Sequence, residues 1–395
     1  MKTANHLLAP IGEHILPIET WTPTNAAPDE EFEYIDIASV DRESKRITNA
    51  NQLLTTDAPS RARQIVRDGD VLVSTVRPNL NAVAMVPAHL SDAIASTGFC
   101  VLRCHSQTLD RDYLFHWVRT AEFVNDMIRK ATGASYPAVS DRIIKESQIP
   151  LPPLSEQKRI ADILDKADAI RRKRQDAITV LLSIPGCAFH SMFGTPAHNT
   201  KGWKIGTIRD LLYEVKYGSS SKAGAEGEYP MLRMNNITYE GTWDLSDLKY
   251  VDLPEKDLPK YLARKGDILF NRTNSKELVG KTAVFQEETP MAFAGYLVRA
   301  RTNGLAHPDY IAGYLNSPHG KATLRHMCKN IVGMANINAQ EFQEILIPHP
   351  PIEAQLEYVR LLDGVRQSEK PLRQALKESE GLYNCLVQRA FRGEL

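Results

Sequence analysis

One stretch of this 395-residue sequence decides the fold, because it occurs twice. The first copy reads Ile149-Pro150-Leu151-Pro152-Pro153-Leu154-Ser155-Glu156-Gln157 and leads into a long, charged, helix-like pattern. The second copy begins 198 residues later (347 minus 149) and reads Ile347-Pro348-His349-Pro350-Pro351-Ile352-Glu353-Ala354-Gln355. A sequence that repeats itself at a fixed distance predicts a duplicated architecture with two quasi-symmetric halves.

Further matches keep nearly the same spacing. The stretch Arg67-Asp68-Gly69-Asp70-Val71-Leu72-Val73 parallels Arg264-Lys265-Gly266-Asp267-Ile268-Leu269-Phe270, 197 residues later, and Asp112-Tyr113-Leu114 parallels Asp309-Tyr310-Ile311. Cys187 and Phe193 match Cys385 and Phe391 at a spacing of 198. Identities between these matches are sparse, so we expect the halves to share a fold but to bind different things.

The composition is that of an ordinary soluble protein, with 43% hydrophobic and 24% charged residues, and the length suggests two or three domains. We recognise no apolar run near the ~20 residues of a membrane span and no signal peptide in residues 1–19. The five cysteines are scattered, which favours a reduced, cytoplasmic environment. Cys100, Cys104 and His105 lack a second ligand pair at finger spacing, so we expect no metal site.

The net charge is zero, which argues against a nucleic-acid-binding protein that works alone, since neutralising phosphates normally needs an excess of Lys and Arg. The charge is unevenly placed, however. Residues 1–33 hold one Lys and six acidic residues, whereas Arg171-Arg172-Lys173-Arg174 is a basic run. The net charge of zero is therefore the sum of acidic and basic patches.

Prolines predict the domain boundaries. Pro150, Pro152 and Pro153 disfavour helix in the residues before them, so each copy of the stretch is expected to be an extended strap. We predict a mixed α+β domain at residues 1–150, a helix at 151–197, a repeated α+β domain at 198–348 and a second helix at 349–395. The two long helices are expected to pair antiparallel, like a coiled coil, and to join the two domains.

The long helices are predicted in more detail from their caps and prolines. Ser155 is the expected N-cap of the first helix, which should end near Ser183, before Pro185-Gly186. A 29-residue helix would be ~43 Å long, which exceeds the diameter of a ~150-residue domain. This length favours pairing of the helices over the alternative that each packs only on its own domain. Pro371 predicts a kink, or two helices, near Lys370.

No catalytic motif is recognisable in the sequence. It lacks the G-x-x-x-x-G-K-[ST] phosphate loop, the G-x-G-x-x-G dinucleotide fingerprint and the H-E-x-x-H zinc motif. It also lacks the G-x-S-x-G elbow of hydrolases. We therefore predict no catalytic residue in this chain.

What remains is a set of polar loops at matching places in the two halves. Arg suits guanine edges and Asn adenine edges, while Ser, Thr and Lys suit phosphates; the alternative is that these residues simply form turns. The loops Thr132-Gly133-Ala134-Ser135-Tyr136 and Gly333-Met334-Ala335-Asn336 precede the two straps equivalently. The candidate DNA-contacting residues are Ser74, Thr75, Arg77, Asn79, Asn81, Lys216, Ser219, Ser220, Lys222, Arg233, Asn235, Asn271, Arg272, Asn274 and Lys276.

These motifs resemble those of a known family. The strap Pro152-Pro153-Leu154-Ser155-Glu156-Gln157, the stretch Gly266-Asp267-Ile268-Leu269 and the ending Arg389-Ala390-Phe391-Arg392-Gly393-Glu394-Leu395 are similar to the specificity (S) subunits of type I restriction–modification systems. The resemblance covers the whole chain in the family's order of domain, helix, domain, helix. The second strap departs from it, with Ile352-Glu353-Ala354-Gln355 in place of Leu-x-Glu-Gln.

The resemblance implies a function. Each domain would be a target-recognition domain that reads one half of a bipartite, asymmetric double-stranded DNA site. The helices would set the gap between the half-sites and dock two methyltransferase (M) subunits, and restriction (R) subunits would join the complex. The chain itself would be non-catalytic and bind no cofactor, while S-adenosylmethionine, ATP and magnesium would belong to the partner subunits.

Two other classes remain open from the residues alone. A stand-alone DNA-binding regulator would bind a duplex tightly without partners, which the neutral charge disfavours. An interaction scaffold would bind no nucleic acid, which the Arg- and Asn-containing loops weakly disfavour.

Overall fold

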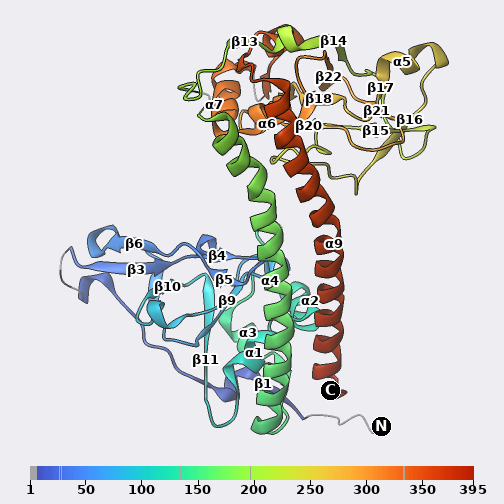
Figure 1. Ribbon diagram of the computed structural model, residues 1–395. Coiled ribbons are helices and arrows are strands. Elements are labelled where there is room, and N and C mark those ends of the chain that lie inside the picture. The colour runs from blue at the N-terminus through green and yellow to red at the C-terminus, as the bar shows by residue number, and fades with distance from the viewer. Residues whose placement is uncertain (1–6, 26, 28, 134, 196, 332–333) are drawn as a thin grey trace. The chain divides into compact units, whose positions relative to one another are not determined.

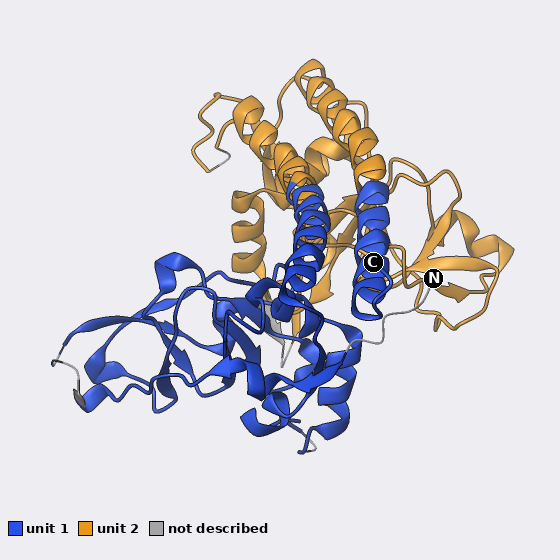
Figure 2. Ribbon diagram, turned by 90° about the horizontal axis from the view of Figure 1, so that it is seen from below, with its two compact units in different colours: residues 1–176, 373–395 blue, residues 177–372 orange. Residues whose placement is uncertain are grey.

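The computed structural model describes residues 7–25, 27, 29–133, 135–195, 197–331 and 334–395. The chain divides into two compact units (Figure 2): unit 1 comprises residues 1–176 and 373–395, and unit 2 comprises residues 177–372. Each unit therefore combines a globular domain with parts of both long helices. The predicted boundaries at 150/151 and 348/349 separate each globular domain from the long helix that follows it. The two units are divided differently, within the helices, so these domain boundaries stay a prediction.

Unit 1 contains two main sheets (Figure 1). One has the strand order β6 (Asn51–Leu54), β3 (Glu31–Ile35), β10 (Ile94–Ser96), β7 (Ala62–Ile65). The other has the order β2 (Ile15–Leu16), β11 (Phe99–Cys104), β8 (Val71–Ser74), β9 (Val83–Met85). Smaller pairs are β1 (Leu8–Pro10) with β12 (Gln148–Pro150) and β4 (Val40–Asp41) with β5 (Arg46–Ile47). The helices of this domain are α1 (Arg111–Trp117), α2 (Ala121–Lys130) and α3 (Asp141–Lys145).

Unit 2 repeats this arrangement. Its sheets have the orders β16 (Lys249–Val251), β15 (Tyr229–Leu232), β21 (Met291–Phe293), β17 (Leu262–Ala263) and β14 (Leu212–Tyr217), β22 (Leu297–Thr302), β18 (Ile268–Asn271), β20 (Thr282–Val284). β13 (Ile205–Thr207) pairs with β25 (Leu346–Pro348), and β19 (Thr273–Asn274), β24 (Met334–Asn336) and β23 (Lys329–Ile331) form a further sheet. The helices are α5 (Leu258–Tyr261), α6 (Pro308–Asn316), α7 (Pro318–Met327) and α8 (Ala339–Gln343).

The pairing pattern confirms the predicted duplication. β10 pairs parallel with β3 and antiparallel with β7, and β21 does the same with β15 and β17. The central strands β8 and β18 alternate in the same way. In β8, Val71 and Val73 pack with the helices, while Leu72 packs between the sheets. In β18, Ile268 and Phe270 pack with the helices, while Leu269 packs between the sheets. Strand side chains point alternately to opposite faces, so each of these strands supplies two cores.

The turn before each of these strands is also built twice. Gly69 and Gly266 have positive φ values of 81° and 89°, a region that glycine adopts without strain. The following aspartate is buried, and its carboxylate accepts two hydrogen bonds from an arginine: Arg103 to Asp70 at 3.0 and 2.8 Å, and Arg301 to Asp267 at 2.7 and 3.1 Å. The Gly-Asp sequence therefore forms a turn in both units, and the structure shows that its carboxylate is anchored by an arginine.

The long helices differ from the prediction at their ends. α4 (Leu154–Phe193) and α9 (Ile352–Phe391) each have 40 residues. Ser155 is the second helical residue and not the N-cap, and the expected end near Ser183 is wrong, because α4 continues through Pro185. The alternative of two helices near Lys370 is also wrong, because α9 continues through Pro371.

Packing explains why α4 continues past Pro185. A proline in a helix interior costs ~3 kcal/mol, but Phe189 and Phe193 are almost completely buried beyond it in the core of unit 2. Burying a phenylalanine side chain contributes ~1.5–3 kcal/mol, so two of them offset the loss. Phe189 stacks on Tyr310 with ring centroids 5.7 Å apart.

The helices pair antiparallel within each unit. In unit 1 Arg159 donates to the carbonyl oxygen of Leu395, and Arg174 donates to that of Ala375. In unit 2 the ring of Tyr358 in α9 lies 5.6 Å from that of Phe189 in α4. The helices also pack on the domains, since Ile160 and Leu164 join the core of unit 1. The predicted coiled-coil-like pairing is confirmed.

A buried glutamine connects each strap to its domain. The side-chain Oε1 of Gln157 accepts from the backbone N–H of Asp110 (2.9 Å), and its Nε2 donates to the carbonyl oxygens of Thr108 (3.0 Å) and Pro152 (2.9 Å). Gln355 makes the same set in unit 2, with the N–H of His307 and the carbonyls of Leu305 and Pro350. This explains why the second strap keeps its glutamine although the residues before it differ.

We predict that Gln157→Leu destabilises unit 1, because it leaves a partly buried N–H, a partly buried carbonyl and a buried carbonyl without their partner, at ~1–3 kcal/mol for a fully buried group. Urea unfolding should show the loss, and Gln355→Leu should destabilise unit 2 similarly. The control is Gln148→Leu, at an exposed position whose amide donates to Glu146. Equal stability of the Gln157 and Gln148 variants would contradict this role.

Candidate nucleic-acid interface

The loop that follows β8 brings two of its predicted residues to the surface. Arg77 and Asn79 are exposed, and Arg77 adopts a left-handed φ of 49°. The Arg77 guanidinium lies 4.7 Å from the ring centroid of Tyr136, and the Arg77 N–H donates to the carbonyl of Pro137 (2.7 Å). The loop after the Gly-Asp strand therefore contacts the loop before the strap, although Ala134 in that second loop lies outside the described residues.

Other candidate residues in and next to this loop make hydrogen bonds within the protein instead. Ser74 and Thr75 are buried, and the Thr75 hydroxyl donates to the carbonyl of Gly98 at 3.0 Å. Asn81 is half-buried with a φ of 45°, and its amide donates to the carbonyl of Arg119 (3.3 Å). Because Ser74 and Thr75 have little accessible surface, we no longer treat them as candidate base or phosphate contacts.

The corresponding loop of unit 2 contains Arg272, which is half-buried and surrounded by polar groups. The Arg272 guanidinium lies 5.1 Å from the ring of Tyr217 and donates to the carbonyl of Gly295 and the Oδ1 of Asn336, both at 3.4 Å. β19 pairs with β24, so again the loop after the Gly-Asp strand contacts the loop before the strap. Gly333 in that loop lies outside the described residues.

The described hydrogen bonds of the Arg272 guanidinium within the protein are weak. Its Nε is buried without a hydrogen-bond partner among the described residues, and its two described hydrogen bonds are long. A guanidinium stacked on an aromatic ring is held in one plane, which suits bidentate recognition of a base edge or phosphate. Asn274 is half-buried and Lys276 is exposed in the same loop.

Asn271 lies at the end of β18 inside the core, with no accessible surface. Its Oδ1 accepts from the N–H of Thr273 (3.3 Å), and its Nδ2 has no partner among the described residues. The expectation that Asn271 contacts DNA is therefore withdrawn, because the strand places its side chain on the interior face.

The remaining candidates lie in two other segments of unit 2. Lys216, Ser220 and Lys222 are exposed, whereas Ser219 is buried next to Ala294. In the second segment Asn235 is exposed. Arg233 is half-buried, and its guanidinium donates to the carboxylate and the carbonyl of Asp247 at 2.9 and 2.8 Å. Arg233 is thus already paired with an acid, which makes it a weaker candidate than Arg272.

The sequence placed Tyr136 and Asn336 in the loops before the straps, but it did not predict that Tyr136, Tyr217 and Asn336 contact arginines from other segments. The two tyrosines are 69% and 44% exposed, and each lies under an arginine from another segment. A tyrosine within a polar loop was the feature of the sequence that could have indicated a binding site. Which arginine it contacts could be found only from the three-dimensional structure.

The residues described near these loops form no cluster of metal-binding side chains. The described residues contain no group of three or more His, Cys, Asp and Glu side chains able to hold a metal ion. Cys100 is completely buried on β11, and burial raises the pKa of its thiol. A thiol that stays protonated is a poor metal ligand.

Comparisons with known proteins point to one family. The model of the type I restriction modification DNA specificity domain matches residues 37–180 and 200–378. The chain is 25% identical over 329 residues to the specificity subunit of the type I restriction enzyme EcoKI of Escherichia coli K12, covering 78% of this chain and 70% of that protein. It is 23% identical over 316 residues to the StySPI specificity subunit of Salmonella potsdam, covering 75% and 68%.

Solved structures agree with this result. A chain from a study of complex assembly and conformational transition in a type I restriction–modification system has a TM-score of 0.58 and 25% identity, with 100% of both chains covered. The S subunit of such a system from M. genitalium also has a TM-score of 0.58, at 14% identity, with 99% and 98% covered. The second likeness concerns the fold alone.

We predict that Asn271→Ala lowers stability and leaves ligand binding by the folded protein unchanged. The substitution removes the acceptor for the buried Thr273 N–H, a loss of ~1–3 kcal/mol. Urea unfolding should report it. Asn235→Ala, an exposed position, is the matched control and should keep wild-type stability. An unaltered unfolding midpoint for Asn271→Ala would refute the structural role.

Proposed function

We propose a mode of target recognition for this chain, which belongs to the type I restriction–modification DNA specificity family and is the non-catalytic specificity subunit of such a system. Subunits of this kind recognise the DNA target and work with modification and restriction subunits. The observation that carries the proposal is the duplication, in which the family model, the Gly-Asp turn, the strap glutamine and a 40-residue helix all occur twice.

Each unit would read one half of a bipartite, asymmetric DNA site through its loop pair. Arg77 and Tyr136 in unit 1, like Arg272 and Asn336 in unit 2, come from the loop after the Gly-Asp strand and the loop before the strap. Tyr217, which lies against Arg272, comes instead from the end of β14. Arginine reads guanine through two hydrogen bonds. Because the surrounding residues differ between the units, the two half-sites are proposed to differ in sequence.

The long helices are proposed to dock two modification subunits, one at each of two equivalent surfaces. Ile184 in unit 2 and Leu382 in unit 1 are 36% and 56% exposed and are related by the 198-residue spacing. Cys187 and Cys385, one helical turn further, are exposed as well. An apolar surface present twice suits a partner that binds twice.

This apolar character also bears on the membrane. α4 contains an 18-residue stretch that is long and apolar enough to cross a bilayer by length and composition, of which 17% is buried. One such helix is weak grounds for a membrane span, and covering by a partner protein accounts for the same surface. We propose that the chain acts in the cytoplasm and that its partners bind the S-adenosylmethionine, ATP and magnesium.

Methylome sequencing tests the function. Host DNA from cells with and without the gene would be compared for methylated adenines in the presence of the modification subunit. A bipartite motif that disappears with the gene is the expected result. A stand-alone regulator would instead bind its duplex without a modification subunit, and a scaffold would leave the methylome unchanged.

We predict that Arg272→Ala weakens binding of the cognate site by ~1–3 kcal/mol and relaxes selection in the half-site of unit 2 only, because a bidentate base contact is lost. Binding assays with the assembled methyltransferase on single-base variants of the site would measure this. Arg272→Lys keeps the charge but not the fork, so it should resemble Arg272→Ala in selectivity.

The control for this prediction is Arg209→Ala. Arg209 is a half-exposed arginine in unit 2 that pairs at 3.9 Å with Glu344, away from the loop. Wild-type methylation of the native site by the Arg272 variants would exclude this residue from recognition.

The length of α4 and α9 is proposed to set the gap between the half-sites. Both helices run from one unit into the other, and the units divide at 176/177 and 372/373. We predict that inserting four residues at both places, about one turn or ~6 Å, lengthens the gap by one or two base pairs. Each half-site sequence should stay the same.

Methylome mapping of this double insertion would decide the matter. An insertion in α4 alone is the control. It shifts the antiparallel pairing out of register and should reduce stability without defining a new gap. An active double-insertion enzyme that keeps the native gap would show that the helices are not the spacer.

A further inference from the structure

Unit 1 contains a polar cavity that the proposed base-reading loops do not use. Its volume is about 290 Å³, and it lies where the β4–β5 turn meets both long helices. We call it the Lys45 pocket. Its lining residues are Glu43, Lys45, Arg119, Arg171, Glu380, Tyr383 and Asn384.

Lys45 is an unusual lysine in this pocket. It adopts a left-handed φ of 57° in the turn after β4, and its Nζ donates to the carbonyl oxygen of Asn81 at 2.6 Å rather than to a carboxylate. Burial, together with the nearby Arg119 and Arg171, lowers the pKa of Lys45 to about 8. The ammonium group is thus held half-buried near two other cations, an arrangement that an anion would stabilise.

The two arginines of the pocket share one acid. Arg119 and Arg171 donate to the buried Asp168 at 3.2 and 2.9 Å, and Arg172 lies 3.6 Å from the same carboxylate. Burial alone would raise the pKa of Asp168, but these arginines lower it overall. One carboxylate cannot balance three guanidinium groups and Lys45.

Three further acids lie near the pocket. Glu43 and Glu380 belong to its lining, and the charge of Asp41 raises the pKa of Lys45, but all three are exposed, and solvent screens their charges. Arg119 is also held by stacking, 4.8 Å from the ring of Phe115 and 5.6 Å from that of Tyr383, and its side chain is only 7% exposed. The inner part of the pocket is therefore positive and rigid.

The pocket is continuous with the loop that follows β8. Lys45 holds the carbonyl of Asn81, and the amide of Asn81 donates to the carbonyl of Arg119. Asn81 ends the same short loop that presents Arg77 and Asn79 at the surface. A ligand that lies along this loop would reach the pocket next.

We propose that the Lys45 pocket binds one phosphate of the DNA backbone beside the half-site read by unit 1. This inference rests on the proposed function, and it assigns the pocket a sequence-independent contact. Such a contact positions the duplex without reading bases. The positive charge of the Lys45 pocket would neutralise a phosphate locally, although the net charge of the chain is zero.

The test uses Lys45→Asn in the assembled methyltransferase. Asparagine tolerates the left-handed conformation better than most residues, so the turn should be kept. Affinity for cognate and non-cognate duplexes would be measured between 50 and 200 mM salt. Losing one phosphate contact makes the slope of log affinity against log salt less steep by about 0.9. Over this fourfold change in salt, the affinity of wild type should therefore fall by a factor about 3 times larger than that of the variant. Affinity at 50 mM should fall by the same factor on both duplexes.

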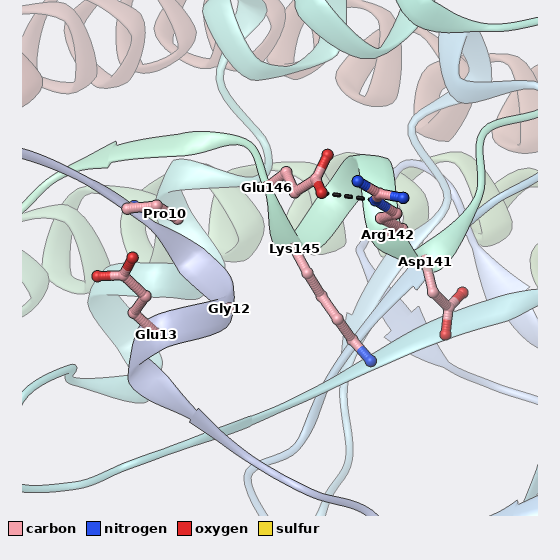
Figure 3. A pocket seen from close by; sticks show the side chains of 7 residues that line it. All are labelled: Pro10, Gly12, Glu13, Asp141, Arg142, Lys145 and Glu146. Carbon is pink, nitrogen blue, oxygen red and sulfur yellow. Dashed lines mark hydrogen bonds and ion pairs between the residues drawn. The ribbon is translucent and has the colours of Figure 1, made fainter.

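Two further variants make the result specific. Lys45→Arg keeps a cation in the pocket and should restore the wild-type slope. Lys145→Asn is the matched control; Lys145 lines a separate surface cavity of about 610 Å³ with Gly12, Glu13 and Asp141 in the same unit (Figure 3), and its slope should not change.

Three outcomes would overturn the phosphate site. An unchanged salt slope for stably folded Lys45→Asn would do so, as would a loss of selectivity confined to the cognate half-site. Weaker association with the modification subunit at wild-type DNA affinity would mean that the pocket takes an acidic side chain of that protein instead. Failure of the proposed function is distinguishable, because then the wild-type complex itself would show no preference for a bipartite site.

Discussion

The buried strap glutamine is the interaction on which the rest of this structure depends. Gln157 and Gln355 each connect three backbone groups: an N–H at the start of a domain helix (α1 or α6), a carbonyl in the loop before it, and a carbonyl in the strap. A primary amide has both donors and an acceptor in one plane, so it can satisfy all three groups. Because these groups are buried or partly buried, leaving them without a partner would cost more stability than each hydrogen bond contributes. The direction in which each long helix leaves its domain is therefore fixed at its first turn.

Each unit is completed by a helix end from the other half of the sequence. Phe391, near the end of α9, packs on Tyr113 and Trp117 in unit 1 with ring centroids 5.0 Å away. Phe193, its counterpart at the end of α4, packs 4.9 Å from Tyr310 in unit 2. Neither globular domain has a closed core without this contribution. This dependence explains why the phenylalanines repeat at the same 198-residue spacing as the straps.

The repeated frame and the proposed recognition loops obey different constraints. Gly69, Asp70, Arg103 and their counterparts in unit 2 are fixed by backbone conformation and by buried charge pairing. The loops that follow carry Arg77 in one unit and Arg272 in the other, in surroundings that share little beyond a stacked tyrosine. A rigid frame with variable loops lets one fold read different DNA sequences, because only the loop residues need to change.

The sequence by itself determined the duplication, the straps, the Gly-Asp turns and the family, because these depend on local backbone rules and on recurring motifs. It also located the polar loops. Only the tertiary structure decided which loop residues are accessible. Asn271 and Ser74 are interior because of strand alternation, and Arg272 is half-buried beside Tyr217 and Asn336, which come from distant segments. The helix ends were misjudged for the same reason. Sequence rules say that a proline such as Pro185 destabilises a helix interior. The burial of Phe189 and Phe193 against residues more than a hundred positions away outweighs this loss of stability.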